Sequence, residues 1–382
     1  MKATLFLLIF YLISVFPASA SENSHTEETN TMRIADLYSD LESFDITLYS
    51  DQPENNLSLE VLLVRSTGTN EKTLDKQVLP IDNIPANKQV TKVGFWNVGN
   101  SERGAYKLKA RLLEGNKAIS EAKYNFAYGT NSALRLQVND LVANSQGISV
   151  ALSPKEASLF DIEYMLVNDS DVVYTTKSEK LSLTSAPDIF SAPWGTLLEN
   201  NKEYTGRVKI QVYSPEREVI SSSERFTARD DAEITDIYKD ETGASATVYG
   251  RSQVPFEGSL IFSVYKLNAN SEKGNDSLIE SAQQKVPVLL NNDDETVEVA
   301  WDHRLPEGIY RLEIELLGND GDVIEHRETV IESDLSQNSN VSSVNNTTSE
   351  AEASGKNGIP GFSAAALISG LAAIFILLRD KI

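Results

Sequence analysis

The feature that most constrains the fold is a pattern that occurs three times along the chain, about 100 residues apart. In each copy a tryptophan is followed nine or ten residues later by a tyrosine, which opens a segment of alternating apolar and polar residues. All three tryptophans of the chain take part, giving the pairs Trp96 and Tyr106, Trp194 and Tyr204, and Trp301 and Tyr310. Alternation with period two is typical of a β-strand with one buried and one solvated face. The pattern therefore predicts three tandem units built from strands.

A turn and a second strand-like segment follow each alternating segment, which predicts one hairpin per unit. About seven short strands in about 100 residues indicate an immunoglobulin-like β-sandwich. The tyrosine that opens the penultimate strand resembles the tyrosine corner of such folds. The chain has no cysteine, so packing alone must hold each unit, and the resemblance is one of architecture only. We expect an all-β protein with three tandem immunoglobulin-like β-sandwiches, stacked end to end, at 33–128, 129–229 and 230–332.

The tryptophans allow two interpretations. Exposed, the ring of Trp96, Trp194 or Trp301 could stack on a sugar, and buried, it would fill the core of its sandwich. A binding site is usually built once, whereas a core position recurs in every repeat. The recurrence therefore favours the core.

The first 20 residues predict a secretory signal peptide. Lys2 precedes an apolar run at 5–16, and Ala18 and Ala20 form a small-residue cleavage pattern. The alternative is an N-terminal membrane helix, but about 14 apolar residues reach only about 21 Å, less than the hydrocarbon core of a bilayer. We expect cleavage after Ala20 and then a polar leader at 21–32.

The last residues, 359–382, predict a membrane-anchoring or sorting tail. An apolar run at 362–378 is followed by basic residues, and directly at its start stand Pro360, Gly361 and Phe362. This order resembles the archaeal PGF-CTERM sorting signal. The resemblance implies that an archaeosortase removes the tail and attaches a lipid to the new C-terminus. The alternative is an uncleaved transmembrane helix, because the run is just long enough to span a bilayer.

Residues 333–358 are rich in serine, asparagine and threonine and nearly free of apolar side chains, which predicts a disordered, solvated stalk. Acceptor tripeptides for N-glycosylation are expected where Asn-x-Ser/Thr occurs. They lie at Asn340, Asn345 and Asn346 in the stalk, and at Asn56, Asn168 and Asn275 in the three units. Such tripeptides arise easily by chance, but export would bring them to glycosylating enzymes.

Charge and composition exclude several functions. The 56 acidic residues outnumber the 34 basic ones, giving a net charge of -22 that repels phosphate backbones, so we expect no nucleic-acid partner. The only histidines are His25, His303 and His326, which argues against a histidine metal cluster. Motifs of serine hydrolases, zinc proteases and phosphate-binding loops are missing. We therefore expect no catalytic residues and no enzyme activity.

Acidic residues cluster at 229–233, 291–295 and 319–322. Structural Ca²⁺ at a unit junction would stiffen the stack, whereas solvated acidic loops are the simpler interpretation. None of the clusters matches an EF-hand, and Asp-Gly at 320–321 suits a hairpin turn. We expect no other metal or cofactor.

These features together predict a non-enzymatic structural or adhesive protein at the extracellular face of the cell membrane. Its expected partners are an archaeosortase-type processing enzyme, envelope proteins or glycans, and the membrane itself through the tail or a lipid. The alternatives are a module that binds an extracellular ligand or polysaccharide, and an enzyme without recognisable catalytic residues. A binding site should make one unit differ from the other two.

Overall fold

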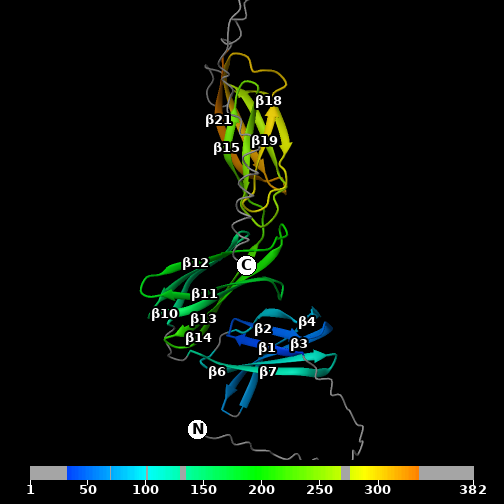
Figure 1. The fold of residues 1–382 in the computed structure, drawn as a ribbon, viewed down its shortest axis with the longest axis vertical. Coiled ribbons are helices and arrows are strands. Elements are labelled where there is room, and N and C mark those ends of the chain that lie inside the picture. The colour runs from blue at the N-terminus through cyan, green and yellow to red at the C-terminus, as the bar shows by residue number, and fades with distance from the viewer. Residues whose placement is uncertain (1–31, 69, 100–101, 130–134, 268–275, 335–382) are drawn as a thin grey trace, which may run out of the picture. The chain divides into compact units, whose positions relative to one another are not determined.

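The computed structural model describes residues 32–68, 70–99, 102–129, 135–267 and 276–334. Across these residues the chain is all-β, as the alternating segments predict, and its 21 strands follow one another from β1 to β21 (Figure 1). In this part of the chain no helix is long and apolar enough to cross a membrane. The predicted signal peptide at 1–20 and the sorting tail at 359–382 lie outside the described residues, as does nearly all of the stalk.

The strands form three successive sets of seven with the same order of sheets. The first set comprises β1 (Arg33–Ser39), β2 (Ser43–Ser50), β3 (Glu54–Thr67), β4 (Asn70–Ile84), β5 (Lys88–Phe95), β6 (Gly104–Glu114) and β7 (Lys117–Tyr128). The second comprises β8 (Leu136–Ala143), β9 (Gly147–Pro154), β10 (Ser158–Asn168), β11 (Asp171–Leu183), β12 (Asp188–Pro193), β13 (Glu203–Ser214) and β14 (Glu218–Thr227). The third comprises β15 (Ala232–Lys239), β16 (Gly243–Gly250), β17 (Ser259–Lys266), β18 (Ser277–Lys285), β19 (Asp294–Ala300), β20 (Gly308–Leu317) and β21 (Val323–Ser333).

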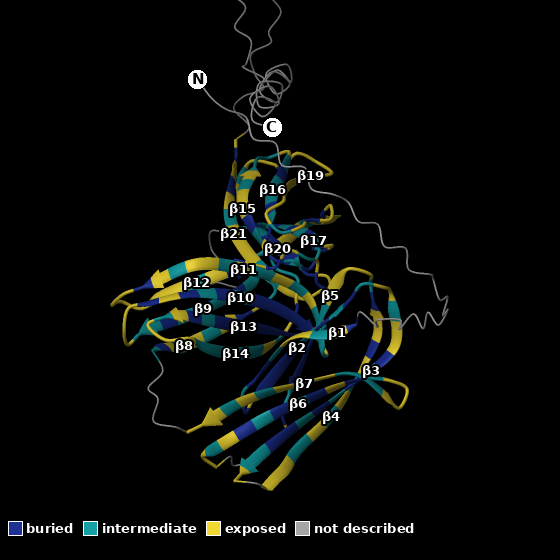
Figure 2. Ribbon diagram, turned by 60° about the horizontal axis from the view of Figure 1, so that its bottom comes forward, coloured by how far each residue is buried: buried dark blue, intermediate teal, exposed yellow. Residues whose placement is uncertain are grey.

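Each set contains one three-stranded and one four-stranded group of antiparallel strands. The groups are β1-β2-β5 and β4-β3-β6-β7, then β12-β9-β8 and β11-β10-β13-β14, then β15-β16-β19 and β18-β17-β20-β21. Every set has its own buried cluster, to which both groups contribute apolar side chains. Along strands such as β6 and β20 buried residues alternate with more exposed ones, as the colours of Figure 2 show. The two sheets of a set therefore pack on a shared core.

The three predicted hairpins are present as β6–β7, β13–β14 and β20–β21, each an antiparallel pair. At two of their turns Gly115 and Gly321 take positive φ angles of 58° and 79°, a conformation that glycine adopts without strain. Tight turns of this kind fix the register of a hairpin. The alternating pattern read from the sequence thus sets which residues of β6, β13 and β20 face the core.

The first and second sets do not meet only at their ends, as end-to-end stacking would require. Strand β11 of the second set pairs with β5 of the first at Asp171 and Lys92, which joins the two groups into one seven-stranded sheet. Val93 also donates its N–H to the carbonyl of Ser170 at 2.8 Å. A shared sheet is a stiffer connection than a linker, because relative movement of the sets would break backbone hydrogen bonds.

Candidate functional site

The three tryptophans lie inside the cores. Trp96, Trp194 and Trp301 are only 8%, 1% and 6% exposed. Each indole N–H donates to a group beside the turn between the first two strands of its set. The acceptors are Ser39 Oγ at 3.0 Å, the Asn144 carbonyl at 2.8 Å and the Asp240 carbonyl at 3.3 Å. The indole rings thus connect a turn to the core through hydrogen bonds. Because they are buried, they are not available to stack on a sugar.

The tyrosine markers are also buried and hydrogen-bonded to the chain just before their strand. Tyr106 donates to the carbonyl of Glu102, and Tyr310 donates to the carbonyl of Pro306 at 2.8 Å. Tyr204 instead accepts the N–H of Glu199 at 3.3 Å. All three contacts span four or five residues, which is the geometry of a tyrosine corner. The marker pairs are therefore structural residues that anchor loops.

Charged side chains of β13 are buried between the first and second sets. Arg207 is 0% exposed and Lys209 is 3% exposed, although both alternate with the core residues of β13 and were expected on a solvated face. Their partner is Asp45 of β2, which accepts from Lys209 at 2.6 Å and from Arg207 at 3.1 Å. Arg207 also donates to Ser43 Oγ at 2.5 Å. The prediction of a solvated face was wrong for β13, because the first set covers these two side chains.

Further contacts complete this connection, which we call the first joint (Asp36, Ser43, Asp45, Arg207 and Lys209, with the apolar Val93, Met165 and Val167). Burial lowers the pKa of Lys209, but the carboxylates of Asp45 and Asp36 outweigh it, and the pKa lies above its ordinary value. Burial likewise raises the pKa of Asp36, but Lys209 outweighs it, and the pKa lies below its ordinary value. Both shifts favour the charged forms of Lys209 and Asp36 at neutral pH.

A second joint connects the second and third sets through polar contacts. Gln253 donates its N–H to the Ser145 carbonyl and accepts from the Leu198 N–H, both at 3.0 Å. The side chain of Asn201 donates to Asp320 at 2.7 Å, and Asp230 donates its N–H to Asn200 Oδ1 at 3.3 Å. Within the third unit, Asn319 donates its N–H to Asp230 at 2.8 Å. The fold thus brings together two of the three predicted acidic clusters, 229–233 and 319–322. The third cluster, 291–295, is tied to β16 through Tyr249, which donates to Asn292 at 2.7 Å.

These junction carboxylates repel one another. Burial, with Asp322 and Asp320 nearby, raises the pKa of Asp230. Burial, with Glu233 and Asp230 nearby, also raises the pKa of Asp231, against the opposing effect of Arg251. Within the described ranges, three metal-ligating side chains gather within 4.8 Å of one another only at Glu313, His326 and Glu328. Structural calcium at the acidic clusters of the second joint stays a prediction.

The second joint should become more stable as the solution is acidified. A carboxyl whose folded-state pKa is raised binds its proton more tightly in the folded state than in the unfolded state. The ionised carboxylate therefore destabilises the fold above that pKa, and this loss of stability disappears as the pH falls through the pKa. Replacing Asp230 with asparagine should remove the charge, retain an acceptor for Asn319, and stabilise the protein by up to about 1 kcal/mol at pH 7. Thermal unfolding of the wild type and D230N at pH 7 and pH 4 measures the effect, because the gain from D230N should shrink at the lower pH. If D230N destabilises the protein at pH 7, the negative charge of Asp230 does not weaken the second joint.

A polar groove of about 760 Å³ lies between β8 and β14. Its lining includes Gln137, Asn139, Asp140 and the serines 221–223, and also Glu42 from the first set. Both strands are edges of their sheets, so each has unpaired backbone groups on one side. Glu224 also lines the groove and accepts the N–H of Ala143 at 3.0 Å. The groove offers hydroxyl, amide and carboxylate groups to a polar ligand.

The structure describes only part of the modification sites predicted from the sequence. Asn56 is exposed near the start of β3, with a φ of 57°, and Asn168 is partly buried at the end of β10. The remaining acceptors and processing residues lie outside the described residues. They are Asn275, Asn340, Asn345, Asn346, Ala18, Ala20, Pro360, Gly361 and Phe362.

No protein-family model and no curated protein matches the chain. Among solved structures it is similar to trypsin-activated alpha-2-macroglobulin from Escherichia coli, with 11% identity and a TM-score of 0.22, over 80% of this chain and 23% of that chain. It is also similar to a DUF4785 family protein from Legionella pneumophila, with 11% identity and a TM-score of 0.27, over 79% of this chain and 93% of that chain. This chain thus spans about a quarter of the macroglobulin. Function must be argued from its own residues.

Proposed function

We propose that the chain is a non-enzymatic structural or adhesive protein of the cell envelope, built from three immunoglobulin-like β-sandwiches. The observation that carries the proposal is the first joint, where Arg207 and Lys209 are buried against Asp45 with every charge paired. A hinge that opens and closes around a ligand would have to expose and rehydrate these ions in each cycle. Buried pairs of this kind are costly to separate, so they suit a connection that stays closed.

The repeated anchoring of each unit also supports a structural role. In every set the tryptophan and tyrosine markers fasten loops to the core by hydrogen bonds. An extracellular protein without disulfides depends on such hydrogen bonds and on packing for its stability. The proposal includes export through the signal peptide and attachment at the C-terminus.

The proposed anchor rests on the sequence around Pro360, Gly361 and Phe362. Processing by an archaeosortase-type enzyme would remove the apolar tail and leave a lipid, whereas an uncleaved tail would remain as a helix. The mass of the mature C-terminal peptide separates the two. A peptide that still ends at Ile382 would contradict processing, and either form would place the units on the extracellular side.

A second candidate function is binding of an extracellular polysaccharide, which the groove between β8 and β14 favours. Hydroxyl and amide side chains such as Ser222 and Asn139 can hydrogen-bond sugar hydroxyls. The test is retention of the full chain on separated envelope proteins and on separated envelope polysaccharides. The structural proposal expects retention on envelope proteins. Specific retention on one polysaccharide, abolished by N139A together with S222A, would replace it with the binding function.

A further inference from the structure

The outer face of the penultimate and last strands differs among the three sets. The position three residues after each tyrosine marker holds Lys109, Arg207 or Glu313. Directly opposite on the last strand stand Lys123, Ser223 and Glu328 in the same order. Two residues earlier on the last strand the sequence holds Glu121, Ser221 or His326. Only the third set combines two carboxylates and an imidazole at these positions.

In the first two sets the carboxylates near this face have basic partners. In the first set Glu71 pairs with Lys107 at 2.7 Å and also with Lys109, and Arg111 pairs with Glu121 at 2.9 Å. In the second set the first joint supplies Asp45 as the partner of Arg207. Neither face therefore has an excess of negative charge that would attract a metal cation from solution.

The third set, in contrast, has more negative charge than its own residues neutralise. Glu313 and Glu328 lie directly opposite each other, an arrangement of like charges that destabilises a sheet. Glu315 lies directly opposite His326 on the same pair of strands. Among the residues that the structure describes, the cation that pairs with Glu313 is Arg311, at 3.0 Å, and Arg311 is 3.8 Å from Glu328.

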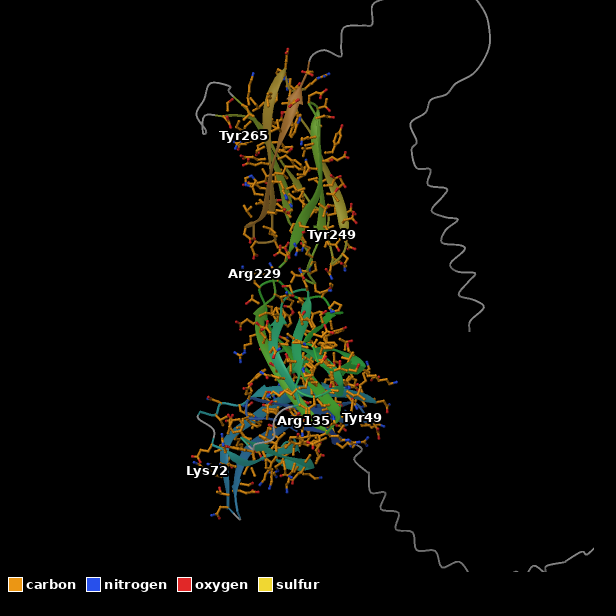
Figure 3. The ribbon with its side chains drawn as sticks, turned by 90° about the vertical axis from the view of Figure 1, so that its left-hand side faces the viewer. Tyr49, Lys72, Arg135, Arg229, Tyr249 and Tyr265 are labelled. Atoms are coloured by element: carbon orange, nitrogen blue, oxygen red, sulfur yellow. The ribbon has the colours of Figure 1, made fainter. Side chains whose placement is uncertain are left out.

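Arg311 also shares its positive charge with other groups. Its guanidinium pairs with Asp276 at 3.4 Å and lies 4.9 Å from the ring centre of Tyr265, a β17 residue labelled in Figure 3. The ligand atoms of Glu313, His326 and Glu328 lie within 4.8 Å of one another, and the His326 Nε2 to Glu328 Oε1 distance is 3.7 Å. Ligand atoms of a tetrahedral zinc ion lie roughly 3.4 Å apart. Small side-chain rotations would therefore bring the three ligand atoms to the spacing that zinc requires.

We propose that Glu313, His326 and Glu328 bind one divalent transition-metal ion on the outer face of the third sandwich, with water completing its coordination. Imidazole with two carboxylates suits Zn²⁺ and similar ions, whereas Ca²⁺ prefers oxygen ligands alone. The side chains of Glu313, His326 and Glu328 are 19%, 43% and 52% exposed, so an ion can reach them from solution. Binding would also relieve the repulsion between the two glutamates. The site is independent of the structural role proposed above.

Zinc titration of the chelator-treated full chain, in competition with a chromophoric indicator, tests the proposal. The wild-type chain should bind one Zn²⁺, and H326A should weaken this binding at least about 10-fold, since even the loss of an outer partner of a metal ligand costs that much. E328Q, which preserves side-chain shape, should weaken it similarly. Circular dichroism shows whether the variants are folded. Zinc affinity in H326A and E328Q equal to that of the wild type would overturn the proposal, as would no binding by the wild type.

Two further variants sharpen the test. His303 is an exposed histidine of the same unit, so H303A is the matched control and should leave zinc binding unchanged. R311Q should tighten binding, because the guanidinium competes with the metal for Glu313 and Glu328. An equal loss of affinity in H303A and H326A would show nonspecific histidine binding. Calcium at the same concentration should not displace the zinc, and displacement by calcium would show a carboxylate-only site instead.

Discussion

Replacing Asp45 with alanine should lower the free energy of unfolding by about 3–5 kcal/mol, because Arg207 and Lys209 would remain buried without their shared carboxylate. Arg207 is 0% exposed and pairs with the carboxylate of Asp45, so water cannot replace the lost charge without opening the first joint. Urea denaturation followed by circular dichroism measures the change. The first and second sets should lose stability together, since the joint belongs to both.

Two companion variants separate this effect from a general loss of charge. E121Q removes the exposed pair between Arg111 and Glu121, whose side chains are 44% and 54% exposed, and should cost less than about 1 kcal/mol. The triple variant D45L/R207M/K209L replaces the buried ions with apolar groups and should come close to the wild-type stability. If D45A costs no more than E121Q, the first joint is not a buried ion network in solution.

Replacing Trp194 with alanine should cost about 3–5 kcal/mol, the usual range for removing a large aromatic ring from a core. Trp194 is 1% exposed and stacks on Phe226 at a centroid distance of 6.4 Å. Its indole N–H also donates to the Asn144 carbonyl, which would lose this partner. Thermal or urea unfolding of the second set measures the loss.

The matched variants test the core interpretation of the tryptophans. W194F keeps most of the ring but removes the donor, so it should cost less than W194A, between about 1 and 3 kcal/mol. I189A truncates an apolar side chain that is 68% exposed on β12, and should change stability by no more than about 0.5 kcal/mol. A W194A variant as stable as I189A would mean that the ring is exposed in solution.

The sequence predicted the hairpins well because their strands carry the strongest alternation. Tyr310 and the next three inward positions of β20 are all buried, and the same holds for β6 from Tyr106. Several other strands escaped prediction for two physical reasons. Edge strands such as β4 and β18 are exposed over most of their length, so they need no apolar face. The first strand of each set contains a register shift, after Ile34, Val138 and Ile234, which interrupts the period of two.

The first joint could not be read from the sequence. Arg207 and Lys209 alternate with apolar residues in the manner of a solvated face, and nothing in that pattern shows which solvated faces another unit covers. Their partner Asp45 lies 162 and 164 positions away along the chain. Glu313, His326 and Glu328 were equally hidden, because the pairing of β20 with β21 brings together residues that are 13 to 15 positions apart. A comparison of the three repeats at these positions would have singled them out.

The polar character of the first joint has a consequence for the order of folding. A chain is synthesised from its N-terminus, so the first set emerges before the strand that carries Arg207 and Lys209. During that interval the face around Asp45 is in contact with water, where a carboxylate is well solvated. An apolar face of the same extent would attract other unfinished chains. A joint made of ion pairs thus leaves the first set with a soluble surface until the second set has folded. The ion pairs of the first joint then form between the two folded sets.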